Sequence, residues 1–229
     1  MIRFVAVDID GTLTFRNRRL DIAGVSAIQK AEDSGLPVVL ATGNVLAFAE
    51  AAAIMLGTSG PLIAEDGGIV FDPASGWECV LGDRVDTERG LAVLEREFGP
   101  LQQTRSSRVR RTGLTLKRTI EAGAAEELFR REGLNLVAVG LGASINLRSP
   151  NVNKGNALRK VASFLRVPLA EVAAIGNDPN DVEMLESAGL SFAVANSHEA
   201  VKRVSTYVTA EPHGKGVAEA IEKILSLRN

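Results

Sequence analysis

The sequence predicts an α/β protein whose core is a doubly wound, Rossmann-like parallel sheet with an α+β domain inserted into it. Three observations support this prediction. Short apolar runs rich in Val, Ile and Ala are typical of strands covered on both faces of a parallel sheet, and they occur at residues 4–7, 37–41, 172–175 and 190–195. Helical patterns separate several of these runs. The segment 83–149 differs from the rest in its pattern and its charge.

The chain begins with strand, helix and strand. Asp21 predicts a helix N-cap. The apolar residues that follow it at helical spacing are Ile22, Val25, Ile28 and Ala31. Gly35 permits a left-handed cap and Pro37 prevents the helix from continuing, so the next apolar run, 37–41, becomes the second strand.

The same alternation returns after residue 153. It predicts helices near 154–166, 179–187 and 214–227 around strands 172–175 and 190–195. The inserted segment predicts helix 87–98, strand 114–119, helix 123–131 and strands 136–139 and 144–148. We therefore predict a core of residues 1–82 and 150–229 and an inserted domain of residues 83–149.

Composition excludes several classes of protein. The chain has 229 residues, with 26 basic and 28 acidic side chains. The net charge of −2 argues against a nucleic-acid-binding protein. Residues 83–149 hold 12 basic and 9 acidic side chains and carry a net charge of +3. Cys79 is the single cysteine, and His198 and His213 lack the spacing of metal ligands.

The apolar run at the N-terminus is too short for a signal peptide, and no later run approaches the ~20 apolar residues of a membrane span. We expect a cytoplasmic protein with neither membrane nor nucleic-acid partners. The sequence is compatible with a homodimer.

Polar side chains follow the first two strands. Asp8 and Asp10, separated by one residue, can share a cation, and Gly11 allows a tight turn beside an anion. A capping or turn cluster is the alternative. Thr42-Gly43-Asn44 follows the second strand, where a hydroxyl and backbone amides at a helix N-terminus would bind an anion. Here the alternative is that Thr42 or Asn44 merely caps the helix.

Two further clusters lie in the second half of the chain. Lys154 opens a helix, where its charge is unfavourable unless an anion compensates it; a solvated lysine is the alternative. Residues 176–181, Gly-Asn-Asp-Pro-Asn-Asp, place two carboxylates and two amides after a strand, although part of this cluster could form turns and caps. Acids, one hydroxyl and one lysine after strands of a single sheet indicate magnesium-dependent phosphoryl transfer.

In these four clusters the sequence resembles the haloacid dehalogenase-like phosphohydrolases. Asp8-Ile9-Asp10-Gly11-Thr12, Thr42, Lys154 and residues 176–181 resemble the four motifs of that family, in the family's order, and the insert resembles its α/β cap domain of the second type. Ala41-Thr42-Gly43-Asn44-Val45, Ile63-Ala64-Glu65-Asp66-Gly67-Gly68 and the chain length resemble the archaeal-type phosphoglycolate phosphatases.

The resemblance implies hydrolysis of a phosphomonoester, phosphoglycolate above all, through an aspartyl-phosphate. It implies that Asp8 is the nucleophile and Asp10 the general acid and base. The implied phosphate-binding residues are Thr42, Gly43, Asn44, Lys154 and Asn180. The implied ligands of a Mg²⁺ cofactor are Asp8, Asp10, Asn177, Asp178 and Asp181.

One position departs from the family pattern. Asn177 stands where relatives usually carry a metal-binding aspartate, and Asp178 follows it. Either Asn177 supplies a neutral carbonyl oxygen, or Asp178 reaches the ion instead. With Asn177 as the ligand we expect weaker magnesium binding than in relatives, and Asp181 would orient Lys154.

The inserted domain carries a cluster of basic residues: Arg105, Arg108, Arg110, Arg111, Lys117 and Arg118. A solvated face is the common reason for such a run, and recognition of a substrate carboxylate by one arginine is the sharper hypothesis. Phosphatases of sugar phosphates or other small phosphorylated acids, and phosphoryl-returning mutases, remain alternative functions. A phosphorylatable receiver-like signalling module is the alternative from another class, but such modules are smaller and lack the insert.

Overall fold

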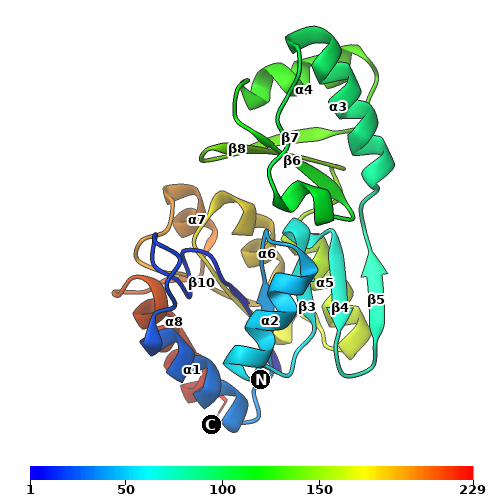
Figure 1. Ribbon diagram of the computed structural model, residues 1–229. Coiled ribbons are helices and arrows are strands. Elements are labelled where there is room, and N and C mark those ends of the chain that lie inside the picture. The colour runs from blue at the N-terminus through cyan, green and yellow to red at the C-terminus, as the bar shows by residue number, and fades with distance from the viewer. Residues whose placement is uncertain (229) are drawn as a thin grey trace. The chain divides into compact units, whose positions relative to one another are not determined.

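The computed structural model of the protein describes residues 1–228, which form two compact units (Figure 1). The first unit comprises residues 1–79 and the described residues from 153 onward, and the second comprises residues 80–152. The predicted insert, 83–149, lies within the second unit.

The first unit is built on one sheet of eight strands, and it confirms the predicted α/β class. The strand order is β11-β10-β9-β1-β2-β3-β4-β5. Strands β11 to β3 run parallel, and β4 is antiparallel to β3. The strands are β1 (Phe4–Asp8), β2 (Val38–Ala41), β3 (Leu62–Ala64), β4 (Ile69–Asp72), β5 (Trp77–Val80), β9 (Val172–Gly176), β10 (Leu190–Ala193) and β11 (Tyr207–Val208).

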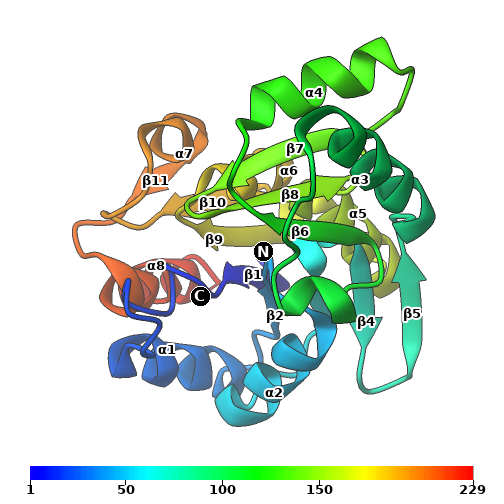
Figure 2. The same ribbon diagram turned by 45° about the horizontal axis from the view of Figure 1, so that its top comes forward.

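Helices cover both faces of this sheet (Figure 2). On one face, α1 (Ile22–Asp33), α2 (Leu46–Leu56) and α8 (His213–Ser226) pack on alternate residues of β1, such as Val5 and Val7. On the other lie α5 (Lys154–Leu165) and α6 (Val182–Ser187). A short α7 (Glu199–Val204) precedes β11. Parallel strands direct their carboxyl ends to one edge of the sheet, where ligands of such folds bind.

Several predicted boundaries shift in the structure. Asp21 caps α1 as predicted, accepting a hydrogen bond from the Ala23 N–H. The helix predicted at 179–187 is a 3₁₀ turn, Pro179–Asp181, followed by α6, and the strand predicted at 190–195 ends at Ala193. Thr42 and Asn44 do not cap α2. That helix begins at Leu46 after Val45, which provides no side-chain cap.

The second unit has a three-stranded antiparallel sheet of order β6-β8-β7, with strands β6 (Gly113–Lys117), β7 (Val137–Leu141) and β8 (Ser144–Arg148). Its helices are α3 (Arg84–Phe98) and α4 (Ala122–Arg131). Leu94, Phe129 and Leu147 belong to the apolar core between them. The helix predicted at 87–98 begins earlier, because Asp83 caps it by accepting from the Val85 N–H. None of the helices within residues 1–228 combines the length and the apolar composition of a membrane span.

Candidate active site

A buried ion triad lies at the carboxyl edge of the large sheet. Asp8 is the last residue of β1, and Lys154 is the first residue of α5. Lys154 Nζ donates to Asp8 Oδ1 at 2.6 Å and to Asp181 Oδ1 at 2.6 Å. All three side chains are almost completely buried. The triad therefore buries two carboxyl groups beside one ammonium group, and when both carboxyl groups are ionised its net negative charge favours a further cation.

Burial and neighbouring charges set the protonation of this triad. Burial raises the pKa of Asp8 to about 8; Asp181 adds to the rise, and Lys154 opposes it. For Lys154, burial works against the charged form, but Asp181 and Asp8 outweigh it and raise its pKa. The lysine thus stays positively charged, although it is buried.

Both carboxylate oxygens of Asp181 accept hydrogen bonds from the protein. Its Oδ1 accepts from Lys154, and its Oδ2 accepts from the backbone N–H groups of Asn177 at 2.9 Å and Asp178 at 3.0 Å. These contacts fix the turn after β9 and hold the lysine toward Asp8.

Asp10 lies beside the triad and is more exposed. Its Oδ2 accepts from Asn44 Nδ2 at 2.7 Å and from Thr42 Oγ1 at 3.3 Å. Its Oδ1 accepts from Arg18 Nη2 at 3.3 Å. The polar residues that follow β1 and β2 are therefore brought together as predicted from the direction of the strands. Arg18 belongs to none of the four sequence clusters.

The Asn177 side chain completes a set of oxygen atoms next to Asp8. The end of its amide that faces Asp8 lies 3.1 Å from the Asp10 carbonyl oxygen and 3.1 Å from Asp8 Oδ2. When the amide nitrogen occupies this end, it donates to both oxygens. When the amide oxygen occupies it, three oxygens lie close together, an arrangement that a cation would stabilise. These donors fit Mg²⁺, which prefers oxygen ligands.

This donor set combines one carboxylate with two neutral oxygens. Accordingly, no group of three or more His, Cys, Asp or Glu side chains within residues 1–228 is arranged to hold a metal ion. The Asp178 side chain instead contacts His198, with 3.5 Å between its Oδ1 and His198 Nε2. Burial raises the pKa of Asp178, and the nearby Asp181 adds to this rise.

A second loop braces the anion-binding segment. Asp66 Oδ1 accepts from Asn180 Nδ2 at 3.0 Å, so Asn180 contacts a carboxylate in this structure. The backbone N–H groups of Glu65 and Asp66 donate to the carbonyls of Asn44 and Thr42, respectively. Both Glu65 and Asp66 are buried and adopt a positive φ, a strained backbone of the kind that clusters at functional sites. Both residues belong to the segment that resembles the archaeal-type phosphoglycolate phosphatases, but the resemblance implied no role for them.

The turn after Asp10 is held from the far end of the chain. Gly11 has φ +88°, and its carbonyl accepts from Asn196 Nδ2 at 3.0 Å. His213 Nδ1 lies 2.9 Å from the same carbonyl oxygen. Thr12, which is fully buried, contacts the Asn177 side chain at 2.9 Å. The sequence indicated no role for His213 or Asn196, because only the fold brings them to this turn.

Among the basic residues of the second unit, Arg110 is buried, and Arg118 pairs with Glu121 at 2.6 Å. Arg108 lines a polar pocket of about 510 Å³ together with Arg84, Leu101, Gln102 and Gln103. Arg84 donates to the carbonyls of Ser107 and Arg110, so its charge is used within this unit.

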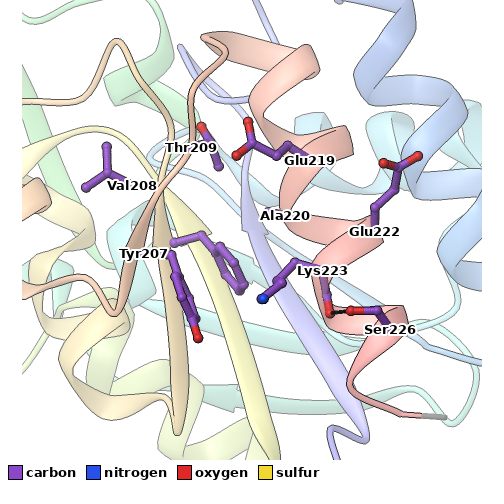
Figure 3. A pocket seen from close by; sticks show the side chains of 9 residues that line it. Tyr207, Val208, Thr209, Glu219, Ala220, Glu222, Lys223 and Ser226 are labelled. Carbon is purple, nitrogen blue, oxygen red and sulfur yellow. Dashed lines mark hydrogen bonds between the residues drawn. The ribbon is translucent and has the colours of Figure 1, made fainter.

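A different pocket of about 460 Å³ lies between β11 and α8 (Figure 3). Its charged groups already have partners. Glu219 accepts from the backbone N–H groups of Ala210 and Glu211, Glu222 pairs with Lys30, and Lys223 lies 5.5 Å from the centre of the Tyr207 ring. The convergent acids and lysine at the sheet edge are therefore the better candidate for chemistry.

The chain is similar to known proteins over most of its length. A family model described as haloacid dehalogenase-like hydrolase matches residues 5–94 and 119–221. A protein of Methanothermobacter thermautotrophicus named phosphoglycolate phosphatase is 36% identical over 224 residues, covering 98% of this chain and 99% of the relative. One of the same name from Archaeoglobus fulgidus is 38% identical over 224 residues, covering 98% and 97%.

Solved structures share the fold. A crystal structure of a Thermoplasma acidophilum protein matches with a TM-score of 0.87 and 26% identity, covering 98% of this chain and 99% of that one. A haloacid dehalogenase-like hydrolase from Bacteroides thetaiotaomicron matches with a TM-score of 0.82 and 20% identity, covering 98% and 100%.

Proposed function

Because the chain belongs to the haloacid dehalogenase-like hydrolase family, we propose that it hydrolyses phosphoglycolate to glycolate and phosphate through an aspartyl-phosphate on Asp8. The observation that carries this proposal is the buried Asp8 carboxylate, 2.6 Å from Lys154 and next to the more exposed Asp10. The archaeal relatives that match over nearly the whole chain bear the name of this activity.

In the first proposed step, an Asp8 carboxylate oxygen attacks phosphorus and the bond from phosphorus to the ester oxygen breaks. Asp10 gives its proton to that oxygen, and glycolate leaves. In the second step, water attacks the aspartyl-phosphate while Asp10 takes up a proton. The bond between Asp8 and phosphorus breaks, inorganic phosphate is released, and the enzyme is restored.

Charge repulsion is the main obstacle to the first step, because a carboxylate must approach a phosphate dianion. At ~4 Å such a pair of unit charges repels by ~4 kcal/mol in an effective dielectric of ~20. Lys154 offsets part of this repulsion and is held in place by Asp181. When bound, Mg²⁺ supplies the rest of the positive charge.

We propose three ligands for that ion: an Asp8 carboxylate oxygen, the Asp10 main-chain carbonyl and the Asn177 side-chain oxygen. Asp181 is left out of the proposed ligand set, because both of its oxygens accept hydrogen bonds from the protein. Asp178 is left out because its carboxylate lies toward His198.

The proposed phosphate-binding groups are the Thr42 side chain, the Gly43 amide and the Asn44 side chain. On substrate binding, the Thr42 and Asn44 side chains exchange their hydrogen bonds to Asp10 Oδ2 for hydrogen bonds to phosphate oxygens. Asn180 acts through Asp66, which braces this loop.

The second unit, residues 80–152, is proposed to be the cap that determines substrate specificity. The proposal also includes a cytoplasmic location and a small phosphomonoester as the substrate.

The test is phosphate release from phosphoglycolate, sugar phosphates and p-nitrophenyl phosphate, with and without Mg²⁺. We expect a magnesium-dependent preference for phosphoglycolate that disappears in the Asp8→Asn variant. A higher kcat/KM for a sugar phosphate would reject the proposed substrate while retaining the chemistry. Stoichiometric phosphorylation of Asp8 without turnover would instead indicate a receiver-like module.

A further inference from the structure

Arg18 is a cation next to Asp10, and the proposed mechanism gives it no role. It lies in the tight turn that follows the Asp8–Thr12 segment. The Arg18 N–H donates to the Phe15 carbonyl at 2.8 Å, the Phe15 N–H donates to the Arg19 carbonyl at 2.9 Å, and Thr14 forms an antiparallel bridge with Leu20. Arg18 itself has φ +66°. An arginine held in this strained conformation points to a function rather than to folding.

The guanidinium group makes a single weak contact. Arg18 Nη2 lies 3.3 Å from Asp10 Oδ1, and the two side chains are 65% and 38% exposed. An exposed pair of this kind contributes little to stability. No other hydrogen bond of this side chain is found within residues 1–228, so most of its five donors remain available for a ligand.

The proposed reaction places its leaving group next to Asp10 and therefore near Arg18. The inference drawn from this placement rests on that proposed function. Asp10 must contact the ester oxygen to protonate it. In phosphoglycolate, one carbon separates that oxygen from a carboxylate. Arg18 contacts Asp10 Oδ1, whereas Thr42 and Asn44 both donate to Asp10 Oδ2. A guanidinium there is within reach of the substrate carboxylate.

We propose that Arg18 binds the carboxylate of the substrate and thereby selects phosphomonoesters that carry an acid next to the ester oxygen. On binding, the guanidinium exchanges its single contact with Asp10 for a bidentate pair with the substrate, the geometry that arginine favours for carboxylates. This proposal assigns carboxylate recognition to the first unit, whereas the hypothesis from the sequence assigned it to the arginine-rich segment of the insert.

The experiment compares phosphoglycolate with ethyl phosphate, which lacks the carboxylate. The variants are Arg18→Gln and Arg18→Lys, and Arg16→Gln is the matched control, since Arg16 is an exposed arginine of the same turn. We expect Arg18→Gln to raise KM for phosphoglycolate about 30-fold and to change kcat/KM for ethyl phosphate much less. Arg18→Lys should recover part of the loss, and Arg16→Gln should behave as the wild type.

Inhibition by glycolate gives a second measure that does not depend on phosphoryl transfer, and its inhibition constant should rise in parallel with KM. A wild-type preference for phosphoglycolate that Arg18→Gln leaves intact would overturn the role of Arg18 alone. An equal loss on both substrates would also overturn it, because a merely structural role predicts that result. A wild-type enzyme with no preference between the two esters would overturn the proposed substrate as well.

Discussion

Lys154 Nζ lies 2.6 Å from Asp8 Oδ1, although the two residues are 146 positions apart in the chain. One is the last residue of the first strand, and the other is the first residue of the helix that follows the insert. The contact therefore joins the two stretches of chain that build the first unit. It also brings a buried positive charge to the carboxylate that, as we propose, attacks phosphorus.

Replacing this lysine should affect both stability and activity. Lys154→Met leaves the buried Asp181 carboxylate without its cation and removes the hydrogen-bond donor to Asp8, so we expect a loss of about 3–5 kcal/mol in the free energy of unfolding at neutral pH. We expect kcat to fall by about 100- to 1000-fold, because the charge that offsets phosphate repulsion is lost. Urea unfolding and phosphate release measure the two effects.

The control for this prediction is Lys160→Met, which changes an exposed lysine of the same helix. It should alter neither quantity appreciably. If Lys154→Met retained wild-type kcat, the role proposed for Lys154 in the reaction would be wrong.

Asp8→Asn should stabilise the metal-free protein in a pH-dependent way. Burial raises the pKa of Asp8 from 3.8 to about 8, so between these values the folded protein holds a proton that the unfolded chain has released. The contribution of Asp8 to stability is therefore complete below pH ~4 and is lost as the pH rises toward 8. The advantage of Asp8→Asn should grow over this range, by at most about 1.4 kcal/mol per pH unit.

Urea unfolding in EDTA at pH 5 and pH 8 checks this prediction, with Asp33→Asn on the exposed end of α1 as the control. A constant difference between Asp8→Asn and wild type at the two pH values would contradict it.

The Asn177 side chain should set the magnesium affinity. Asn177→Asp adds a negative charge beside Asp8 Oδ2 and the Asp10 carbonyl, so we expect about tenfold tighter Mg²⁺ binding. Without metal, the same buried charge should destabilise the fold, because no cation compensates it there. Calorimetric titration with Mg²⁺ and thermal unfolding in EDTA measure these opposite effects. Asp178→Asn is the matched comparison and should leave the magnesium affinity unchanged. A loss of affinity in Asp178→Asn, with no gain in Asn177→Asp, would identify Asp178 as the ligand instead.

A side chain at Gly11 should strain the backbone and also disturb the site. Its φ is +88°, and a Cβ would lie 2.5 Å from Asn177 Nδ2. Gly35 also has a positive φ, but a Cβ there would meet nothing within 4 Å. Alanine at either position should cost about 1–2 kcal/mol of stability through backbone strain. Only Gly11→Ala should also lower kcat/KM and magnesium affinity, and equal activity of the two variants would exclude a close fit between Gly11 and Asn177.

The sequence predicted the core of the site because parallel strands direct their ends to one edge. Asp8, Thr42 and the 176–181 segment each follow a buried apolar run, so the periodicity of the chain was enough to group them. The start of α2 was not predictable in the same way. The Thr42 hydroxyl accepts from the Asn44 N–H at 3.0 Å within the loop, and the helix begins at Leu46 without a side-chain cap.

Other parts of the site depend on contacts that no local pattern contains. Asn180 and Asp66 are 114 positions apart, and His213 lies 202 positions from Gly11. Arg18 reaches Asp10 only because the chain makes a tight turn between the two residues. Such contacts arise from loop conformations and chain topology, which single-sequence periodicity does not encode.

The most direct test of the account is chemical trapping of the phosphorylated enzyme. Wild-type protein turning over phosphoglycolate with Mg²⁺ is quenched, treated with borohydride and digested, and its peptides are sequenced by mass spectrometry. An aspartyl-phosphate on Asp8 predicts conversion of Asp8, and of no other carboxylate, to homoserine, with none in Asp8→Asn or without substrate. Active enzyme in which Asp8 stays unreduced while a different residue is modified, or no residue is, would contradict the account.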